Sequence, residues 1–276
     1  GPLTRKRMET IDEEVLDKTE AFIKRAVEAD TPFFVWFNAT RMHVFTHLKE
    51  ESAGKTGKGL YPDGMVEHDG HVGQLLDLLD ELKIADDTIV FYSTDNGAET
   101  FTWPDGGTTP FHGEKATTWE GGVRVPAAVR WPGKIPAGKV VNGIVSHLDW
   151  APTLLAAAGV PDIKGMLNQG VQIGDRQYKV HLDGYSMLDY FMSGGEGEGP
   201  RKEIFYFTDI GQMSAVRHGD IKVHFMVQEG HGFDVWKQPY IPLGWPSMVN
   251  LRADPFERAM HESIGWADWS VRRMYA

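Results

Sequence analysis

The order of apolar and polar positions predicts alternating helices and strands in the N-terminal third of the chain. Apolar residues recur at helical spacing over Thr10–Ala29, a segment that opens with the capping-box pattern T-x-x-E. Phe33–Phe37 is a continuous apolar run of strand length, typical of a strand covered on both faces. A second helical stripe occupies residues 63–82, and a second apolar run occupies residues 88–93. This order predicts an α/β fold with a mostly parallel sheet flanked by helices.

The pattern changes after the segment SGGEGEGP at residues 193–200, which is typical of a linker. Before it, we expect a short strand over 125–131 and a short helix over 149–158. After it come three short strand-like runs separated by turn residues, at 204–208, 213–217 and 221–227. We therefore expect two domains: residues 1–196 form part of an α/β core, and residues 197–276 form a small C-terminal antiparallel subdomain.

Composition narrows the class of protein. The 28 Lys and Arg residues against 39 Asp and Glu residues give a formal net charge of −11, which argues against a nucleic-acid partner. Cysteine is absent, which excludes disulfides, a thiolate nucleophile and Cys-based metal sites within this sequence. No apolar run is long enough to predict a membrane-spanning helix.

The strongest local signal follows the second apolar run. Asp95 and Asn96 come directly after this predicted strand and are followed by Gly97. In open parallel sheets, ligands bind beyond the carboxyl ends of the strands, and carboxylate and amide oxygens suit Ca²⁺ or Mg²⁺. Asp-Asn-Gly is also ordinary turn chemistry, so taken alone the tripeptide leaves a plain turn as the simpler interpretation.

A histidine follows the other apolar run. His43 comes a few residues after Phe37, so a parallel sheet would bring it to the same edge as Asp95. Its imidazole can contact an anionic substrate or protonate a leaving group. The chain has 11 histidines, so a simple hydrogen-bonded loop residue is the competing interpretation. A metal pair of His43 with His47 is disfavoured because the residues between them do not form a clear helical pattern.

A third signal is Lys115, in the glycine- and threonine-rich string HGEKATTWEGGVRVP at residues 112–126. Backbone and hydroxyl donors gathered beside an ammonium group would suit an anion. On composition alone, a solvated lysine in a mobile loop is the competing interpretation.

The order and spacing of these three signals resemble the sulfatase family over nearly the whole chain. Further matching strings are RWPG at 130–133, SHLDWAPT at 146–153, LDG at 182–184 and NLRADPFE at 250–257. The chain is similar to type I, formylglycine-dependent arylsulfatases of the alkaline-phosphatase superfamily. The resemblance implies an alkaline-phosphatase-like sheet with a small C-terminal antiparallel subdomain.

The resemblance also implies roles for four residues. Asp95 and Asn96 match two ligands of the family's catalytic divalent cation, usually Ca²⁺, with Mg²⁺ as the alternative. His43 matches the histidine near the leaving-group oxygen, and Lys115 matches the lysine that binds the sulfate. Together, a cation, a lysine and a histidine would offset charge on the sulfuryl oxygens as the S–O bond breaks.

The departures from the family are informative. The family nucleophile is a Cys or Ser in a C/S-x-P-x-R motif that is converted to formylglycine, and this chain contains no such motif. The family's first pair of metal-binding aspartates also has no match. We therefore expect a C-terminal fragment of a sulfatase that is inactive alone, with formylglycine only in the missing N-terminal part. The resemblance favours a periplasmic or secreted protein.

Three function hypotheses follow. The first is a sulfuric ester hydrolase acting on a small-molecule or glycan sulfate ester. The second is a phosphonate monoester or phosphodiester hydrolase of the same superfamily. The third is a non-catalytic truncated module. Tryptophans 236, 245, 266 and 269 could line a substrate cleft, although large aromatic residues more often pack in a core.

Overall fold

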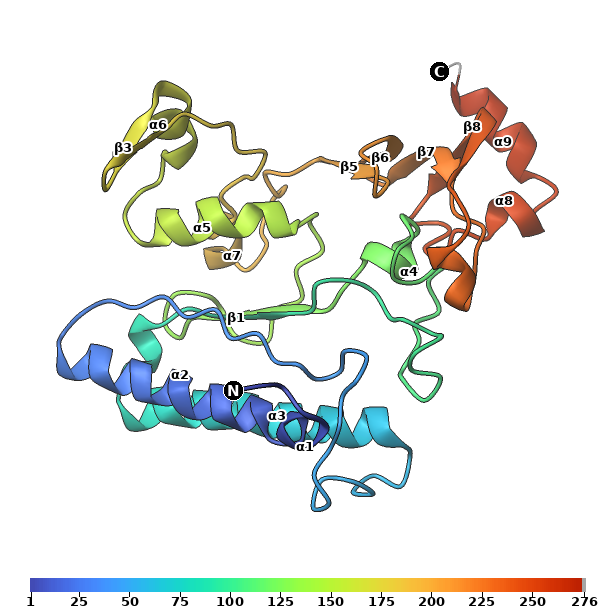
Figure 1. Ribbon diagram of the computed structural model, residues 1–276. Coiled ribbons are helices and arrows are strands. Elements are labelled where there is room, and N and C mark those ends of the chain that lie inside the picture. Colours follow the sequence, from blue (N-terminus) through green and yellow to red (C-terminus); the bar gives the residue numbers. More distant parts are fainter. Residues whose placement is uncertain (275–276) are drawn as a thin grey trace. The chain divides into compact units, whose positions relative to one another are not determined.

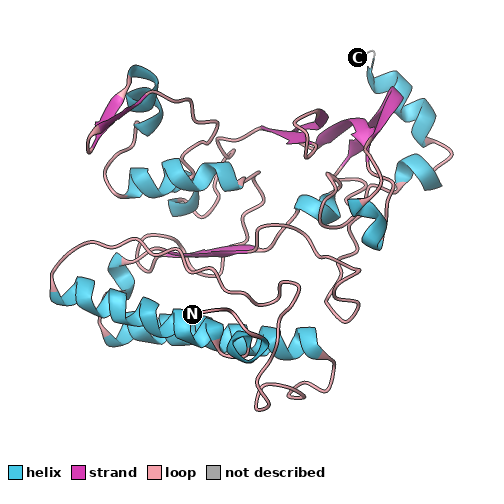
Figure 2. Cartoon of the chain, in the orientation of Figure 1, coloured by secondary structure: helices cyan, strands magenta, loops and turns pink. Residues whose placement is uncertain are grey.

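The computed structural model describes residues 1–274 (Figures 1 and 2). The chain divides into two compact units. Unit 1 comprises Gly1–Thr109 and Val125–Trp131. Unit 2 comprises Pro110–Arg124 and the chain from Pro132 onward. The two units are defined by how densely their residues contact one another, which does not test the domain boundary predicted after residue 196. That boundary stays a prediction.

Unit 1 consists of two long helices, short helical turns and a two-stranded sheet. Leu16 and Ile23 of one long helix and Leu78 and Leu79 of the other are buried, because the two helices pack side by side (Figure 1). The elements are α1 (Arg5–Met8), α2 (Ile11–Glu28), α3 (Leu60–Glu81), η1 (Ala85–Asp87), β1 (Val90–Ser93) and β2 (Ala127–Arg130). Both predicted helices are confirmed, and α3 begins three residues before its predicted start at residue 63.

The predicted capping box at the start of α2 is wrong. The Thr10 side chain makes no capping hydrogen bond. Its backbone N–H donates to the carbonyl oxygen of Arg7 at 3.2 Å, and its carbonyl accepts from the N–H of Glu14 at 3.0 Å. Thr10 thus closes the last turn of α1 and opens α2 through its backbone, which leaves the hydroxyl no capping role.

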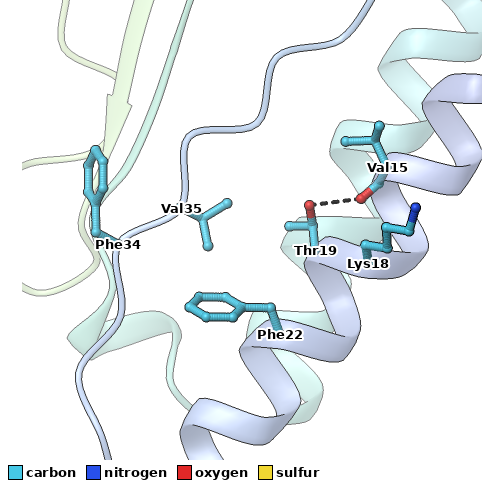
Figure 3. Close-up of a pocket in the computed structure, with 6 residues that line it drawn as sticks. All are labelled: Val15, Lys18, Thr19, Phe22, Phe34 and Val35. Atoms are coloured by element: carbon cyan, nitrogen blue, oxygen red, sulfur yellow. Dashed lines mark hydrogen bonds between the residues drawn. The ribbon is translucent and has the colours of Figure 1, made fainter.

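The predicted strand at Phe33–Phe37 is also wrong. Residues 32–40 carry no strand assignment, and Phe34 and Trp36 are 71% and 79% exposed. Phe33, Val35 and Phe37 are half-buried in alternation with them, the period expected of an extended chain with one covered face. Figure 3 shows Val35 turned toward Phe22 of α2 and Phe34 turned away, around an apolar depression of about 280 Å³. A β-strand forms only where a neighbouring segment offers backbone hydrogen bonds, and an apolar run alone does not provide such a neighbour.

The second predicted strand is confirmed as β1, which pairs antiparallel with β2 in the register Val90↔Arg130 to Ser93↔Ala127. The Ser93 hydroxyl also donates to the carbonyl oxygen of Pro126 at 3.0 Å. The α/β fold class is confirmed. All ladders formed by residues 1–274 are antiparallel, so the expected parallel pairing between residues 33–37 and 88–93 is not among them.

Unit 2 contains the predicted C-terminal antiparallel sheet, with strand order β5-β6-β7-β8. β5 (Glu203–Phe207), β6 (Met213–His218) and β7 (Ile221–Val227) confirm the three predicted strands. β8 (Ile241–Asn250) was not predicted, because Pro242, Gly244 and Pro246 are residues that disfavour strands. It is accommodated as the last strand of the sheet, where a missing N–H donor is tolerated.

The remaining elements of unit 2 are short. α5 confirms the predicted helix over 149–158, and α8 and α9 follow the NLRADPFE string. They are α4 (Glu120–Val123), η2 (His147–Asp149), α5 (Trp150–Ala157), α6 (Ile163–Gln169), β3 (Val171–Ile173), β4 (Arg176–Tyr178), α7 (Leu188–Met192), η3 (Gly232–Trp236), α8 (Ala259–Glu262) and α9 (Trp266–Met274). Within residues 1–274, every helix is too short or too polar to cross a membrane.

Candidate functional site

His43 lies in unit 1, on a turn that follows the extended segment 33–37. Its N–H donates to the carbonyl oxygen of Thr40 at 2.9 Å, and its own carbonyl accepts from the Thr46 hydroxyl at 2.9 Å. The residue is exposed, so the imidazole is accessible to a ligand. The segment between His43 and His47 is a turn and not a helix.

A buried ion network holds the turn that carries His43. The side chain of Arg41 is fully buried and donates through Nε to Glu67 of α3 at 2.9 Å. Asp12 of α2 accepts from the backbone N–H of Thr40 at 2.9 Å and from that of Arg41 at 3.2 Å. Both long helices therefore fix the backbone just before His43. Nothing in the sequence pattern marks Arg41 as a buried residue with this role.

Asp95 and Asn96 also lie in unit 1, immediately after β1. Asp95 is exposed and Asn96 is half-buried. The Asn96 amide nitrogen donates to the carbonyl oxygen of Gly97 at 2.9 Å. Because the nitrogen is engaged there, the amide oxygen is the side chain's acceptor for another ligand. The predicted position of this pair at the end of a strand is thus observed.

The donor chemistry of Asp95 and Asn96 fits a hard divalent cation, since both offer side-chain oxygens. The fit is partial. Within residues 1–274, no group of three or more His, Asp and Glu side chains is arranged to hold a metal ion. The described part of the chain thus offers two oxygen-bearing side chains to a cation that takes six to eight ligands when it is Ca²⁺.

Lys115 lies in unit 2, near the tip of a loop whose base is buried. Glu114 and Thr117 on either side are buried, whereas Lys115 is half-buried and Ala116 is exposed. The Thr117 hydroxyl donates to the Glu114 carbonyl at 2.7 Å, and the N–H of Gly121 donates to the carbonyl of His112 at 2.6 Å. These two hydrogen bonds close the loop on itself beneath Lys115.

Glycines allow this closure. A Cβ atom on Gly113 would lie 2.5 Å from the Thr117 hydroxyl oxygen and 2.6 Å from the Trp119 Cβ, so no larger residue fits there. Ala116 has a φ of +71°, a left-handed conformation that is costly for a residue with a Cβ. The surrounding bonds hold this unfavourable residue next to Lys115, as is common where a loop serves a ligand.

A buried ion cluster anchors the same loop to the C-terminal sheet. The Lys222 ammonium, which is wholly buried, donates to the Thr118 carbonyl at 2.8 Å and lies 3.1 Å from Glu120 and 3.0 Å from Glu257. Glu257 accepts from the backbone N–H of Glu120 at 2.6 Å and contacts His224 Nε2 at 2.9 Å. These contacts join residues 118–120 to β7 and to the segment before α8.

Burial and charge oppose each other in this cluster. Burial alone would raise the pKa of Glu257, but the contacts with His224 and Lys222 outweigh it and hold that pKa below the usual 4.5. Burial lowers the pKa of His224 below its ordinary 6.5, so this imidazole is neutral at pH 7. The resulting Lys222–Glu120–Glu257 group is an ion triad with a neutral histidine beside it.

The sequence pattern does not mark Lys222 or His224 as buried residues. They occupy alternate positions of β7, and both are buried. Polar residues at alternate strand positions normally indicate a solvent-facing side. Glu120 and Glu257 lie in strings that the resemblance had marked, whereas Lys222 and His224 lie outside them.

The four predicted site residues divide between the two units. His43, Asp95 and Asn96 belong to unit 1, and Lys115 belongs to unit 2. The predicted convergence of Lys115 with the other three depends on the placement of the units, and it stays a prediction.

Comparisons with known proteins identify the class. The profile of the family described as Sulfatase matches residues 2–160, more than half of the chain, so the chain belongs to the sulfatase family. The structure is similar to the PsFucS1 sulfatase from Pseudoalteromonas sp., with a TM-score of 0.80 and 25% identity. That match covers 99% of this chain and 54% of the other. The resemblance that the sequence motifs indicated is thus confirmed.

The chain is also similar in sequence to sulfatases that have different names. The chain is 35% identical to N-acetylgalactosamine-6-sulfatase of Canis lupus familiaris over 74% of this chain and 36% of the relative. It is 32% identical to Arylsulfatase A of Homo sapiens over 78% of this chain and 40% of the relative. The chain therefore matches well under half of the length of these relatives.

Proposed function

We propose that this chain is part of a sulfuric ester hydrolase and contributes the sulfate-binding and leaving-group side of its active site. The observation that carries the proposal is the anchored loop that presents Lys115 within a sulfatase family member. A half-buried ammonium on a closed loop suits a sulfate group. The names of the relatives support a sulfate ester as the substrate class.

Each of the four residues has a distinct task in this proposal. Lys115 neutralises charge on the sulfuryl oxygens. His43, exposed on its clamped turn, gives a proton to the oxygen of the departing alcohol. Asp95 and Asn96 supply two oxygen ligands to a divalent cation, Ca²⁺ or Mg²⁺. When bound, that cation would withdraw electron density from the sulfuryl group.

The nucleophile is the part that residues 1–276 do not provide. The sequence has no cysteine and no serine followed by x-Pro-x-Arg, so formylglycine has no precursor here. In the proposal, the nucleophile comes from a segment that carries the C/S-x-P-x-R motif. Turnover requires that segment, whereas sulfate binding at Lys115 does not.

Binding of inorganic sulfate to the chain tests the lysine directly. We expect sulfate to shift the backbone amide resonances of residues 113–122 in an NMR titration. Lys115→Met removes a charge-assisted contact, and we expect sulfate affinity to fall by about 10- to 100-fold. Lys202→Met is the matched control, because Lys202 is a lysine of the same unit that pairs with Glu198 near the surface. Equal sulfate affinity in wild type and Lys115→Met would refute the assignment.

The reaction is tested in a longer version of the polypeptide that includes the C/S-x-P-x-R motif. Hydrolysis of 4-nitrocatechol sulfate is expected to exceed that of bis(4-nitrophenyl) phosphate and to be lost in Lys115→Met. A preference for the phosphodiester would instead assign the protein to the alternative hydrolase class. No turnover of either substrate would favour a non-catalytic module.

A further inference from the structure

Residues 231–240, here called the aromatic segment, lie beside Lys115. The ammonium of Lys115 is 5.9 Å from the ring centroid of Trp236, at the end of η3. This distance is within the range in which a cation is attracted to an indole face. About half of Trp236, 51% of its surface, remains exposed to solvent. A large aromatic side chain therefore borders the position proposed for the sulfate.

The segment that carries Trp236 is fastened to the Lys115 loop at three places. The N–H of Gly232 donates to the Glu114 carboxylate at 2.8 Å, and His231 Nδ1 lies 2.8 Å from the same carboxylate oxygen. The Tyr240 hydroxyl donates to the Ala116 carbonyl at 3.2 Å. Residues 231–240 thus bracket the loop on both sides of Lys115.

Two further hydrogen bonds stabilise these contacts. The buried Trp119 ring donates from Nε1 to the carbonyl of Gln228 at 2.8 Å. The Gln228 side chain donates to the carbonyl of Gln238 at 2.7 Å. Gln228 therefore connects Trp119 of the loop to Gln238, which lies two residues after Trp236. These bonds hold Trp236 and Lys115 in place before a ligand binds.

We propose that Trp236 is a specificity-determining residue of this site, the platform on which the ring of the sulfate ester packs. This rests on the proposed function, because it takes Lys115 as the sulfate-binding residue. With the sulfate on the ammonium, the ester oxygen and the attached ring extend over the neighbouring indole. An aryl ring packs there by offset stacking, and a pyranose ring packs there through its apolar C–H face.

The alternative is that Trp236 only packs as a structural residue. Its exposure argues against that role, because a tryptophan that serves the core buries most of its large apolar surface. The core tryptophan of this region is Trp119, which is 2% exposed. The loop thus already has its packing aromatic, and Trp236 is additional.

Four ligands separate the ring contact from the sulfate contact. Inorganic sulfate and ethyl sulfate have no ring, phenyl sulfate has an aryl ring, and galactose 6-sulfate has a pyranose ring. Each is titrated into the ¹⁵N-labelled chain, with the indole N–H resonance of Trp236 and the amides of residues 113–122 as readouts. We expect phenyl sulfate or galactose 6-sulfate to bind roughly 3- to 10-fold more tightly than ethyl sulfate.

Variants then assign the difference to Trp236. In Trp236→Ala, the advantage of the ring-bearing esters over ethyl sulfate is expected to vanish, while affinity for inorganic sulfate stays within about twofold. Trp236→Phe keeps an aromatic face and is expected to restore most of the advantage. Trp245→Ala is the matched control, because Trp245 of β8 is 49% exposed. Comparison of phenyl sulfate with galactose 6-sulfate shows which ring class is preferred.

The outcomes distinguish the two proposals. Loss of inorganic sulfate binding in Trp236→Ala, or an equal effect of Trp245→Ala, would overturn the platform and leave Lys115 as the sulfate site. An undiminished ring advantage in Trp236→Ala would do the same. Unchanged sulfate affinity in Lys115→Met, or no binding of any of the four ligands, would overturn the proposed function and the platform together.

Discussion

Removal of the Lys222 ammonium is the sharpest test of how the Lys115 loop is held. Lys222→Met keeps the length of the side chain and deletes its charge. The ammonium is wholly buried, donates to Thr118, and lies within 3.1 Å of the carboxylates of Glu120 and Glu257. Its loss leaves two buried carboxylates without the cation between them. Removal of one partner from a buried ion pair typically costs about 3–5 kcal/mol, and we expect unit 2 to lose stability by that amount.

Two assays measure this loss. Urea unfolding followed by tryptophan fluorescence gives the free energy of unfolding, with Trp119 as a reporter whose ring centroid lies 4.4 Å from that of His224. Hydrogen exchange of the amides in residues 114–124 gives the local stability of the loop. A loss of about 3 kcal/mol corresponds to roughly a 100-fold fall in amide protection.

The matched control is Lys237→Met, in a lysine–carboxylate pair whose side chains are 56% and 52% exposed. Surface pairs contribute at most about 1 kcal/mol, so we expect little change there. Equal unfolding free energies for Lys222→Met and Lys237→Met would refute the reasoning. Full amide protection of residues 114–124 in Lys222→Met would show that the cluster does not hold the loop.

Three further predictions concern pH, metal and turnover. Because the folded-state pKa values of His224 and Glu257 are depressed, the unfolded chain binds their protons more readily; stability should therefore fall as pH drops below 6.5 and again below 4.5. His224→Gln should weaken the first phase in acid titrations of the free energy of unfolding, to which His68 and His112 also contribute because burial lowers their pKa values too. His181→Gln, at an exposed site, should leave this phase unchanged. Calorimetry should give weak, about millimolar Ca²⁺ binding that Asp95→Ala abolishes, and micromolar binding that survives this change would mean that the ion sits elsewhere. The chain alone should hydrolyse no aryl sulfate above background, and turnover that disappears in Lys115→Met would show that the mechanism has been misread.

Sequence patterns located α2, α3, α5 and most strands correctly, because those elements are governed by local periodicity. The apolar stripes of α2 and α3 and the alternating C-terminal strands appear where the residues place them. The failure at Phe33–Phe37 has a different origin. An apolar run indicates that a segment prefers burial. A β-strand also needs a neighbouring strand, and the whole fold decides whether one lies alongside.

The same distinction applies to the candidate site. The motifs around His43, Asp95 and Lys115 were sufficient to indicate the family, because chemistry needs particular residue types in a particular order. The residues that support them gave no such signal. Arg41 and Lys222 are charged, and charged residues are rarely buried unless they are paired, so their sequence context predicts exposure.

By itself, the sequence determined the class of this protein, the course of its two long helices and of β5, β6 and β7, and the residue types of the candidate site. The tertiary structure alone decided which groups support them. It buried Arg41 against Glu67 and Lys222 against Glu120 and Glu257. It also brought Trp236 beside Lys115, 121 positions earlier in the chain. The physical reason is that a buried charge is stable only beside its partner, and such partners come from distant segments that no local pattern connects.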